Sequence, residues 1–372
     1  MFILSEQVTN NGASQAALEA RSALNRKFLK RGLMFAVTSG MCYAMYTTFM
    51  MLAQSRGAWA DWYGPNTAAI SLFAITYILG ALGSGINDTC SGVWGLSMNI
   101  AKGRTGDVWR CIKSKPTLII ILSAIIGGPM ASSMYIISLQ LAGSMIIPIT
   151  TTYPAIGAII ARIFLKQPLT PRMGFGILLC LTASIMIGST GMGDDAAAGA
   201  LQGCVIALIA AFCWAIEGVV VGYTTTIMDY EIAITIRQFA SGVTNLLLLT
   251  PFLCLLDGEP GLYAFILSGA VFTWSSMKFF IICSFFALFA FSLWYKGNNM
   301  CGAALGMAAN SAYCFWGPLF CWVIVGIIFG EPGWELPLLV WAAAIIMFIG
   351  IVFIATNPFT LFSKGGQENA TS

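Results

Sequence analysis

The segment MCYAMYTTFM at residues 41–50 is decisive for the fold, because a similar segment, FCWAIEGVVV, returns at residues 212–221. In this alignment Cys42, Tyr43 and Tyr46 match Cys213, Trp214 and Glu217. Each segment lies inside a long apolar stretch and carries its aromatic residues at helical spacing. The pattern indicates that one helix type occurs twice in the chain.

A pair of prolines repeats in the same way. Pro154 and Pro168 lie fourteen residues apart in YPAIGAIIARIFLKQPLT, and Pro318 and Pro332 have the same spacing in GPLFCWVIVGIIFGEPGW. Either match could arise by chance, but together they predict two homologous repeats. The first repeat covers residues 32–190 and the second covers residues 200–357.

Composition places most of the chain in lipid. Of 372 residues, 58% are hydrophobic and 9% charged, whereas soluble domains carry about 25% charged residues. Soluble enzymes and nucleic-acid-binding modules are thereby excluded. The chain has no histidine, which removes His-based metal ligation and His-dependent nucleophiles. Its eleven cysteines form no CxxC motif, so we expect small membrane-core residues, with no metal and no cofactor.

Apolar stretches long enough to cross a bilayer as helices recur from Gly32 onward. The ten predicted spans are 32–54, 65–87, 116–139, 143–165, 171–190, 200–223, 231–255, 276–297, 303–329 and 335–357. Residues 262–275 are expected to form an interfacial extracellular segment. Because 262–297 is long for a single span, an eleventh helix remains an alternative.

Basic residues collect in alternate loops, as the positive-inside rule requires. They occur in the N-terminal tail, after the second span and between spans four and five, whereas the opposite loops are mainly acidic. This predicts cytosolic tails at 1–31 and 358–372, an extracytoplasmic linker at 191–199, and a multi-pass protein of the plasma membrane with both termini in the cytosol. An eleventh span would move Lys364 outside.

Five spans in each repeat give the two repeats opposite orientations, an architecture typical of alternating-access transporters. With its aromatic motifs in spans one and six, and its proline-centred spans followed by short loops, the chain resembles the EamA-like ten-helix branch of the drug/metabolite transporter superfamily over about 32–357. The resemblance implies a central cavity lined by spans one, three, four, six, eight and nine. It leaves the substrate open among amino acids, sugars, nucleotide sugars and other metabolites.

Glu217 is an acid deep in a predicted span, so it should be protonated, paired or exposed to a wet cavity. Small multidrug-resistance members of the superfamily carry a similar membrane-embedded Glu that binds protons and cations, but Tyr46 stands at the equivalent place in span one. Arg237 offers another interpretation. Both residues lie ten positions from residue 227, so their depths should match. Proton coupling by Glu217 and a structural pair with Arg237 both remain open.

Further candidates for substrate binding surround the two motifs. Tyr43 with Tyr46, and Trp214 with Glu217, share helical faces. Polar side chains also precede two prolines that free backbone carbonyls: Thr151 and Tyr153 before Pro154, and Asn310 and Tyr313 before Pro318. Ordinary packing and hydrogen bonding between helices are the competing interpretations.

These features favour a secondary active transporter that moves a small polar or amphipathic metabolite, such as an amino acid, sugar or amine, by alternating access. No P-loop occurs, which leaves proton coupling, exchange or facilitated diffusion. The expected partners are the solute and the bilayer, and no nucleic acid is expected. The protein should be a monomer or a homodimer, and we do not expect it to be an enzyme. An integral-membrane enzyme acting on a lipid-linked substrate is the alternative, and a channel is disfavoured because no charged ring is evident.

Overall fold

A computed structural model of the chain describes residues 15–64, 70–164, 170–190, 199–225, 227–301, 303–331 and 334–355. Regular structure in these ranges is helical throughout, and the described residues contain no strand. The predicted tail at 358–372, with Lys364, and the predicted linker up to residue 198 lie outside the described residues.

The first half of the chain begins with the longest helix. Its elements are α1 (Gln15–Gln54), α2 (Ala58–Tyr63), η1 (Ala74–Ile78), α3 (Leu79–Ala101), α4 (Thr105–Ile112), α5 (Lys115–Ile125), η2 (Ile126–Ser132), α6 (Ser133–Ala142), η3 (Gly143–Met145), α7 (Ile146–Thr150), α8 (Tyr153–Phe164) and α9 (Pro171–Thr190). The segments η1 and η2 are wide π-helical turns that continue directly into α-helix.

The second half contains the remaining helices. They are α10 (Ala200–Thr224), α11 (Tyr230–Thr244), η4 (Asn245–Leu249), α12 (Thr250–Leu256), α13 (Leu262–Phe272), α14 (Trp274–Cys301), α15 (Ala303–Asn310), α16 (Tyr313–Phe320), η5 (Cys321–Ile328) and α17 (Leu338–Ala355). Here η4 is a π-helical turn that joins α11 to α12, whereas η5 continues α16 as a π-helix and ends it at Ile328.

Several helical segments are long and apolar enough to cross a membrane. Within the described residues, five meet both conditions: Lys115–Ala142, Ala200–Thr224, Tyr230–Leu256, Trp274–Cys301 and Gly306–Ile328. Shorter apolar helices accompany them, among them Leu262–Phe272 and Leu338–Phe353. The prediction of an all-α, multi-pass membrane protein is confirmed at this level.

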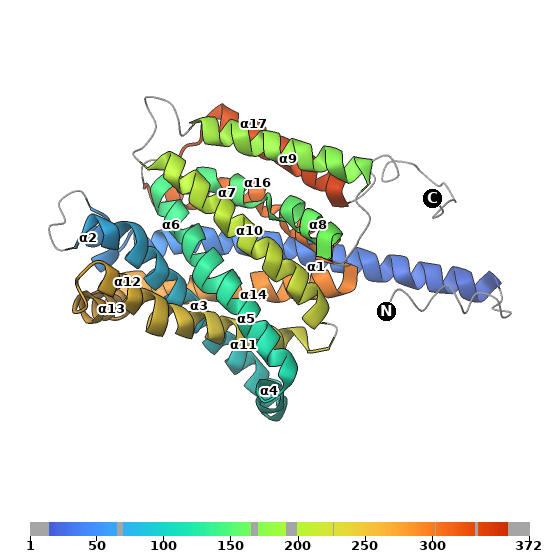
Figure 1. The fold of residues 1–372 in the computed structure, drawn as a ribbon, viewed down its shortest axis with the longest axis horizontal. Helices are drawn as coiled ribbons and strands as arrows, with labels where there is room; N and C mark the ends of the chain where they lie inside the picture. Colours follow the sequence, from blue (N-terminus) through green and yellow to red (C-terminus); the bar gives the residue numbers. More distant parts are fainter. Residues whose placement is uncertain are drawn as a thin grey trace.

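The helices pack in pairs that are distant in sequence. Helix α1 lies along α14, α3 along α11, and α9 along α17, while α10 packs on α6 and η2; the pair α9 and α17 lies side by side at one edge of the bundle (Figure 1). Small residues permit the close approaches. A Cβ atom added to Gly297 of α14 would lie 3.0 Å from the Cβ atom of Ala36 of α1.

Several boundaries differ from those predicted, and α1 begins at Gln15, well before the predicted start of the first span at residue 32. Helix α3 continues to Ala101, well past the predicted end of the second span at residue 87. The two proline-containing segments are each interrupted, at residues 151–152 and at residues 311–312, but their prolines lie at different distances after the break. The chain leaves the helix at Thr151 and Thr152 and restarts as α8 with Pro154 in its first turn, whereas Pro318 lies inside α16.

Candidate functional site

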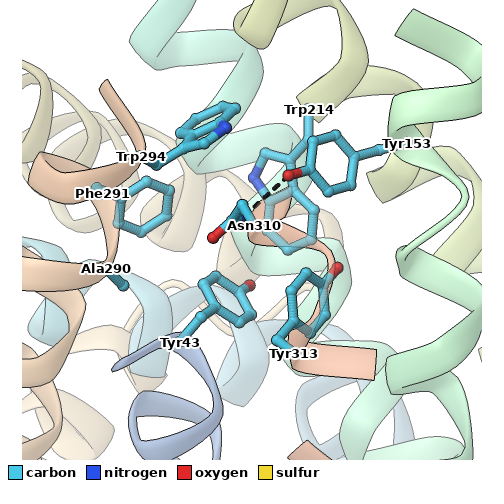
Figure 2. A pocket seen from close by; sticks show the side chains of 8 residues that line it. All are labelled: Tyr43, Tyr153, Trp214, Ala290, Phe291, Trp294, Asn310 and Tyr313. Atoms are coloured by element: carbon cyan, nitrogen blue, oxygen red, sulfur yellow. Dashed lines mark hydrogen bonds between the residues drawn. The ribbon is translucent and has the colours of Figure 1, made fainter. Parts of the chain in front are cut away.

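A small cavity of about 20 Å³, enough for about one water molecule, lies between α1, α8, α10, α14, α15 and α16 (Figure 2). Six of its lining side chains are aromatic, and all eight are buried. The lining consists of Tyr43, Tyr153, Trp214, Ala290, Phe291, Trp294, Asn310 and Tyr313. Because no charged side chain is among them, the cavity wall is apolar with a few polar tips.

The structure brings five of the predicted binding residues together in this wall: Tyr43, Tyr153, Trp214, Asn310 and Tyr313. The other three lie elsewhere. Tyr46 packs behind Tyr43, with ring centroids 5.0 Å apart. Thr151 donates to the backbone oxygen of Pro148, and Glu217 belongs to a separate network described below.

Sequence reasoning missed Ala290, Phe291 and Trp294 of α14. This helix is apolar around most of its circumference, so no polar residue marks the face that turns toward the cavity. The i, i+3 spacing of Phe291 and Trp294 was the one available signal, and it is equally typical of ordinary packing.

Hydrogen bonds hold most of the polar tips of the wall. Asn310 donates through Nδ2 to the hydroxyl of Tyr153 at 2.8 Å and accepts from Ser39 at 2.6 Å. Tyr153 donates in turn to the Met307 carbonyl at 3.0 Å. Trp214 donates to the carbonyl of Gly127 at 3.1 Å. These contacts fix the wall residues before any ligand arrives.

Two lining groups have no hydrogen-bond partner, namely the hydroxyl of Tyr43 and the indole Nε1 of Trp294. Both side chains are buried, at 5% and 4% exposure. They lie at opposite sides of the cavity as drawn, with Asn310 between them (Figure 2). Because buried polar groups normally find partners, and an unpaired one costs about 1–3 kcal/mol, this pair could hydrogen-bond to a water molecule or to a ligand in the cavity.

A buried ion network lies beside the cavity. Arg237 of α11 contacts Glu217 of α10 through two parallel hydrogen bonds, Nε to Oε1 at 2.9 Å and Nη2 to Oε2 at 3.3 Å. Its Nη1 atom lies 3.4 Å from Oδ2 of Asp88 on α3. All three side chains are 1% exposed or less. The structure thus places Glu217 and Arg237 in contact and adds a second carboxyl group.

Polar residues of α3 and α11 surround this network. The hydroxyl of Ser241 donates to Oδ2 of Asp88 in a short contact, and Nδ2 of Asn87 lies 3.0 Å from Oδ1. Gln238 accepts from Arg237 at 2.6 Å and donates to Ser91 at 2.7 Å. The result is a polar seam between two helices, in which almost every donor has an acceptor.

Two glycines of η2 make room for the network. A Cβ atom on Gly127 would lie 1.8 Å from Oε2 of Glu217, and one on Gly128 would lie 1.7 Å from Oγ of Ser241. Sequence reasoning missed both, although two successive glycines before Pro129 in an apolar span are a signal of close approach.

A second cavity of about 60 Å³ lies between the last turns of α3, the first turns of α11 and the middle of α14. Ion pairs border it: Lys102 and Arg104 contact Glu231, and Arg104 also contacts Asp229 at 2.6 Å. Asp229 caps α11 by accepting from the backbone of Glu231 and Ile232. These groups are partly exposed, so they act as a clasp between helix ends and are not a deep site.

Comparison with known proteins identifies the fold alone. No protein-family model matches the chain. No curated protein matches it significantly. Among solved structures, a chain titled "Crystal structure of protein" aligns with a TM-score of 0.57 and 17% identity, over 90% of this chain and 99% of that chain. The helical arrangement therefore occurs in at least one experimentally determined protein.

Proposed function

We propose that the chain is a secondary transporter that carries a small polar or amphipathic solute by alternating access. The observation that carries the proposal is the small, buried aromatic cavity with two unpartnered polar groups, Tyr43 Oη and Trp294 Nε1. Pockets that are mostly apolar, with few convergent polar groups, are typical of small-molecule sites. Here the wall draws on both predicted repeats.

Helix contacts support ten spans arranged as two inverted repeats of the EamA-like type. Helices α1 and α14 are spans one and eight, whereas α10 and the α5–α6 helix are spans six and three. Exchanging each span for its counterpart in the other repeat therefore converts the contact of α1 with α14 into the contact of α10 with the α5–α6 helix, and both contacts occur. The two helices of the pair α3 and α11 are counterparts in the two repeats, and so are α9 and α17, so the exchange leaves both contacts unchanged. This is the pattern that a pseudo-two-fold axis in the membrane plane would produce.

A matching break in two helices supports the same repeat. Residues 151–152 interrupt the first repeat just before Tyr153, and residues 311–312 interrupt the second just before Tyr313. Both tyrosines line the cavity. Non-helical backbone inside a membrane is tolerated where it borders a cavity or is buried in protein, and transporters commonly place such breaks at the binding site.

The chemistry of the wall restricts the solute. Trp294 can only donate a hydrogen bond, whereas the Tyr43 hydroxyl can donate or accept. The solute should therefore offer an acceptor oxygen or nitrogen, with an apolar or weakly cationic part against the aromatic rings. Arg237 is engaged by carboxyl groups, which disfavours a polyanion. Neutral and zwitterionic metabolites and amines fit best.

Transport also requires that the cavity open, and ion pairs hold the helix ends in the closed arrangement. Arg56, after α1, contacts Glu331, after η5. The clasp of Arg104 with Asp229 and Glu231 joins the far end of α3 to the start of α11. Opening toward either side would separate one of these pairs. Being partly exposed, they are weak enough to break reversibly.

The direct test is to reconstitute the full chain in proteoliposomes on a solid-supported membrane and record currents. Pools of amino acids, sugars, amines and nucleosides are applied at two pH values. A current with one pool is the expected result and narrows the substrate class. Silence with every pool, together with unchanged tryptophan fluorescence, would contradict the proposal.

Matched substitutions then locate the site. Tyr43→Phe and Trp294→Phe keep a ring and remove the unpartnered group, so each should raise the apparent solute Kd by about 10-fold, the worth of one hydrogen bond. The controls are Tyr63→Phe and Trp59→Phe, which remove equally buried, unpartnered groups outside the cavity. Equal effects of cavity and control variants would place the binding site elsewhere.

A further inference from the structure

The charges of the buried network do not balance. Arg237 supplies one positive charge, whereas Asp88 and Glu217 supply two carboxyl groups. In the part of the chain that the structure describes, the other titratable side chains that interact with these three residues are phenols and thiols, which are neutral near pH 7. They are Tyr43 and Tyr46 of α1, Cys213 of α10, and Cys283 and Tyr295 of α14. With both carboxyls ionised, one negative charge would be buried without a partner.

An unpaired charge in this position is unfavourable, so one carboxyl group should hold a proton. The geometry distinguishes the two groups. Glu217 faces Arg237 side-on through both of its oxygens and also lies 3.3 Å from the Tyr295 hydroxyl. Two hydrogen bonds from Arg237 therefore stabilise Glu217 in its carboxylate form. Asp88 has one oxygen 3.4 Å from Arg237, a long contact for an ion pair.

The remaining contacts of Asp88 accommodate its neutral form. Ser241 approaches Oδ2, and a hydroxyl can accept a hydrogen bond as well as donate one. Asn87 lies 3.0 Å from the other oxygen, and its amide can face either way. A protonated Asp88 would therefore keep its hydrogen bonds, whereas a protonated Glu217 would leave Arg237 without a full partner.

We propose that Asp88, rather than Glu217, carries an exchangeable proton, and that Glu217 stays ionised as the partner of Arg237. Resting on the proposed transport function, this makes Asp88 the proton-coupling residue. When Asp88 releases its proton to water, the new carboxylate competes with Glu217 for Arg237, whose Nη1 is already 3.4 Å away. The guanidinium then shifts between α10 and α3, which links protonation to helix position.

Infrared spectroscopy on the full chain in lipid films tests the location of the proton without any substrate. We expect a protonated-carboxyl C=O band at neutral pH that shifts when aspartate is labelled with ¹³C at its side-chain carboxyl, and that is absent in Asp88→Asn. Asp107→Asn is the matched control, because Asp107 is half-exposed on α4 and pairs with Arg110. In Asp107→Asn the protonated-carboxyl band should be the same as in the wild type.

Three infrared results would overturn the proposal: no protonated-carboxyl band, a band that shifts with labelled glutamate, or a band that appears only when sodium is replaced by N-methylglucamine. The last would assign the missing positive charge to a metal cation. If Asp88→Asn does not fold, Asp88→Glu is informative, since its band should respond to labelled glutamate in place of labelled aspartate.

Flux measurements separate this inference from the transport proposal. With a solute that gives current in wild-type proteoliposomes, Asp88→Asn should lose pH-gradient-driven accumulation by at least 10-fold while keeping solute exchange across the membrane. Retained accumulation in Asp88→Asn would overturn the coupling role. If the wild type moves no solute, the transport proposal fails, while the infrared result still decides where the proton lies.

Discussion

The ring of Phe291 forms part of the cavity wall, and its centroid lies 4.3 Å from the guanidinium carbon of Arg237. One side chain therefore touches both the space where a solute would bind and the cation that holds two carboxyl groups. Trp214 and Glu217, one turn apart on α10, join the same two regions. Under the proposed function, a solute that displaces Phe291 would also change the environment of Arg237.

Replacing Phe291 with leucine should weaken this connection. Loss of a desolvated cation–π contact costs about 2 kcal/mol, so Phe291→Leu should lower Tm and reduce the pH dependence of flux. Phe285→Leu is the control, because Phe285 lies on the same helix and is 39% exposed. Thermal unfolding in detergent compares the two. A Tm for Phe291→Leu no lower than that of the control would argue against the contact.

Neutralising Arg237 should cost more than neutralising Glu217. Arg237→Gln leaves two buried carboxyl groups without a cation, a loss of about 3–5 kcal/mol. In Glu217→Gln, Asp88 can ionise and replace the lost partner, so the loss should be smaller. The double variant should be more stable than the sum of the single losses predicts. Unfolding measurements of all three would refute the shared-cation arrangement if Glu217→Gln proved the more damaging change.

The glycine at position 127 should not tolerate a methyl group. Because the added Cβ atom would lie 1.8 Å from Oε2 of Glu217, Gly127→Ala must displace the carboxylate from Arg237. We expect a loss of about 3 kcal/mol or more, from overpacking and a disturbed ion pair. Gly174→Ala is the control, since nothing lies within 4 Å of that position and alanine favours helix by up to about 1 kcal/mol. Equal Tm values for the two variants would contradict the close approach.

Sidedness can be tested at two exposed positions. Arg110, on α4, has a side chain that is 80% exposed, and Glu259, between α12 and α13, is exposed as well. If the segment that carries Lys102, Arg104 and Arg110 faces the cytosol, a membrane-impermeant maleimide should label Glu259→Cys in intact cells and Arg110→Cys only after permeabilisation. Cys111→Ser serves as the background, because this neighbouring thiol is half-buried. The reverse labelling pattern would invert the proposed topology.

Local patterns in the sequence predicted a useful part of this arrangement. The helical membrane class follows from composition. The contact of Glu217 with Arg237 follows from their equal distance from a turn, because helices that leave one turn in opposite directions reach equal depths after equal numbers of residues. The ten-span inverted repeat stays a prediction that the helix contacts support.

What the sequence did not reveal depends on partners from distant helices. Asp88 lies just beyond the second predicted span, 65–87, because hydropathy penalises a charge regardless of what lies opposite it. In the structure, Arg237 and Ser241 solvate this carboxyl and α3 continues through it. Likewise, the cavity face of α14 could not be distinguished from its other apolar faces without knowing what packs against them.

The wide turn η2, from Ile126 to Ser132, acts as a one-residue spacer between the two ends of its helix. It sets Gly127 and Gly128 against the ion network, and places Tyr135 of α6, one to two turns later, 5.3 Å from the ring of Trp214. Deleting a single residue here would turn everything that follows by about 100° relative to what precedes. The site therefore depends on the rotation of one end of this helix relative to the other, as well as on its side chains. Insertions or deletions would change this rotation more than most substitutions would.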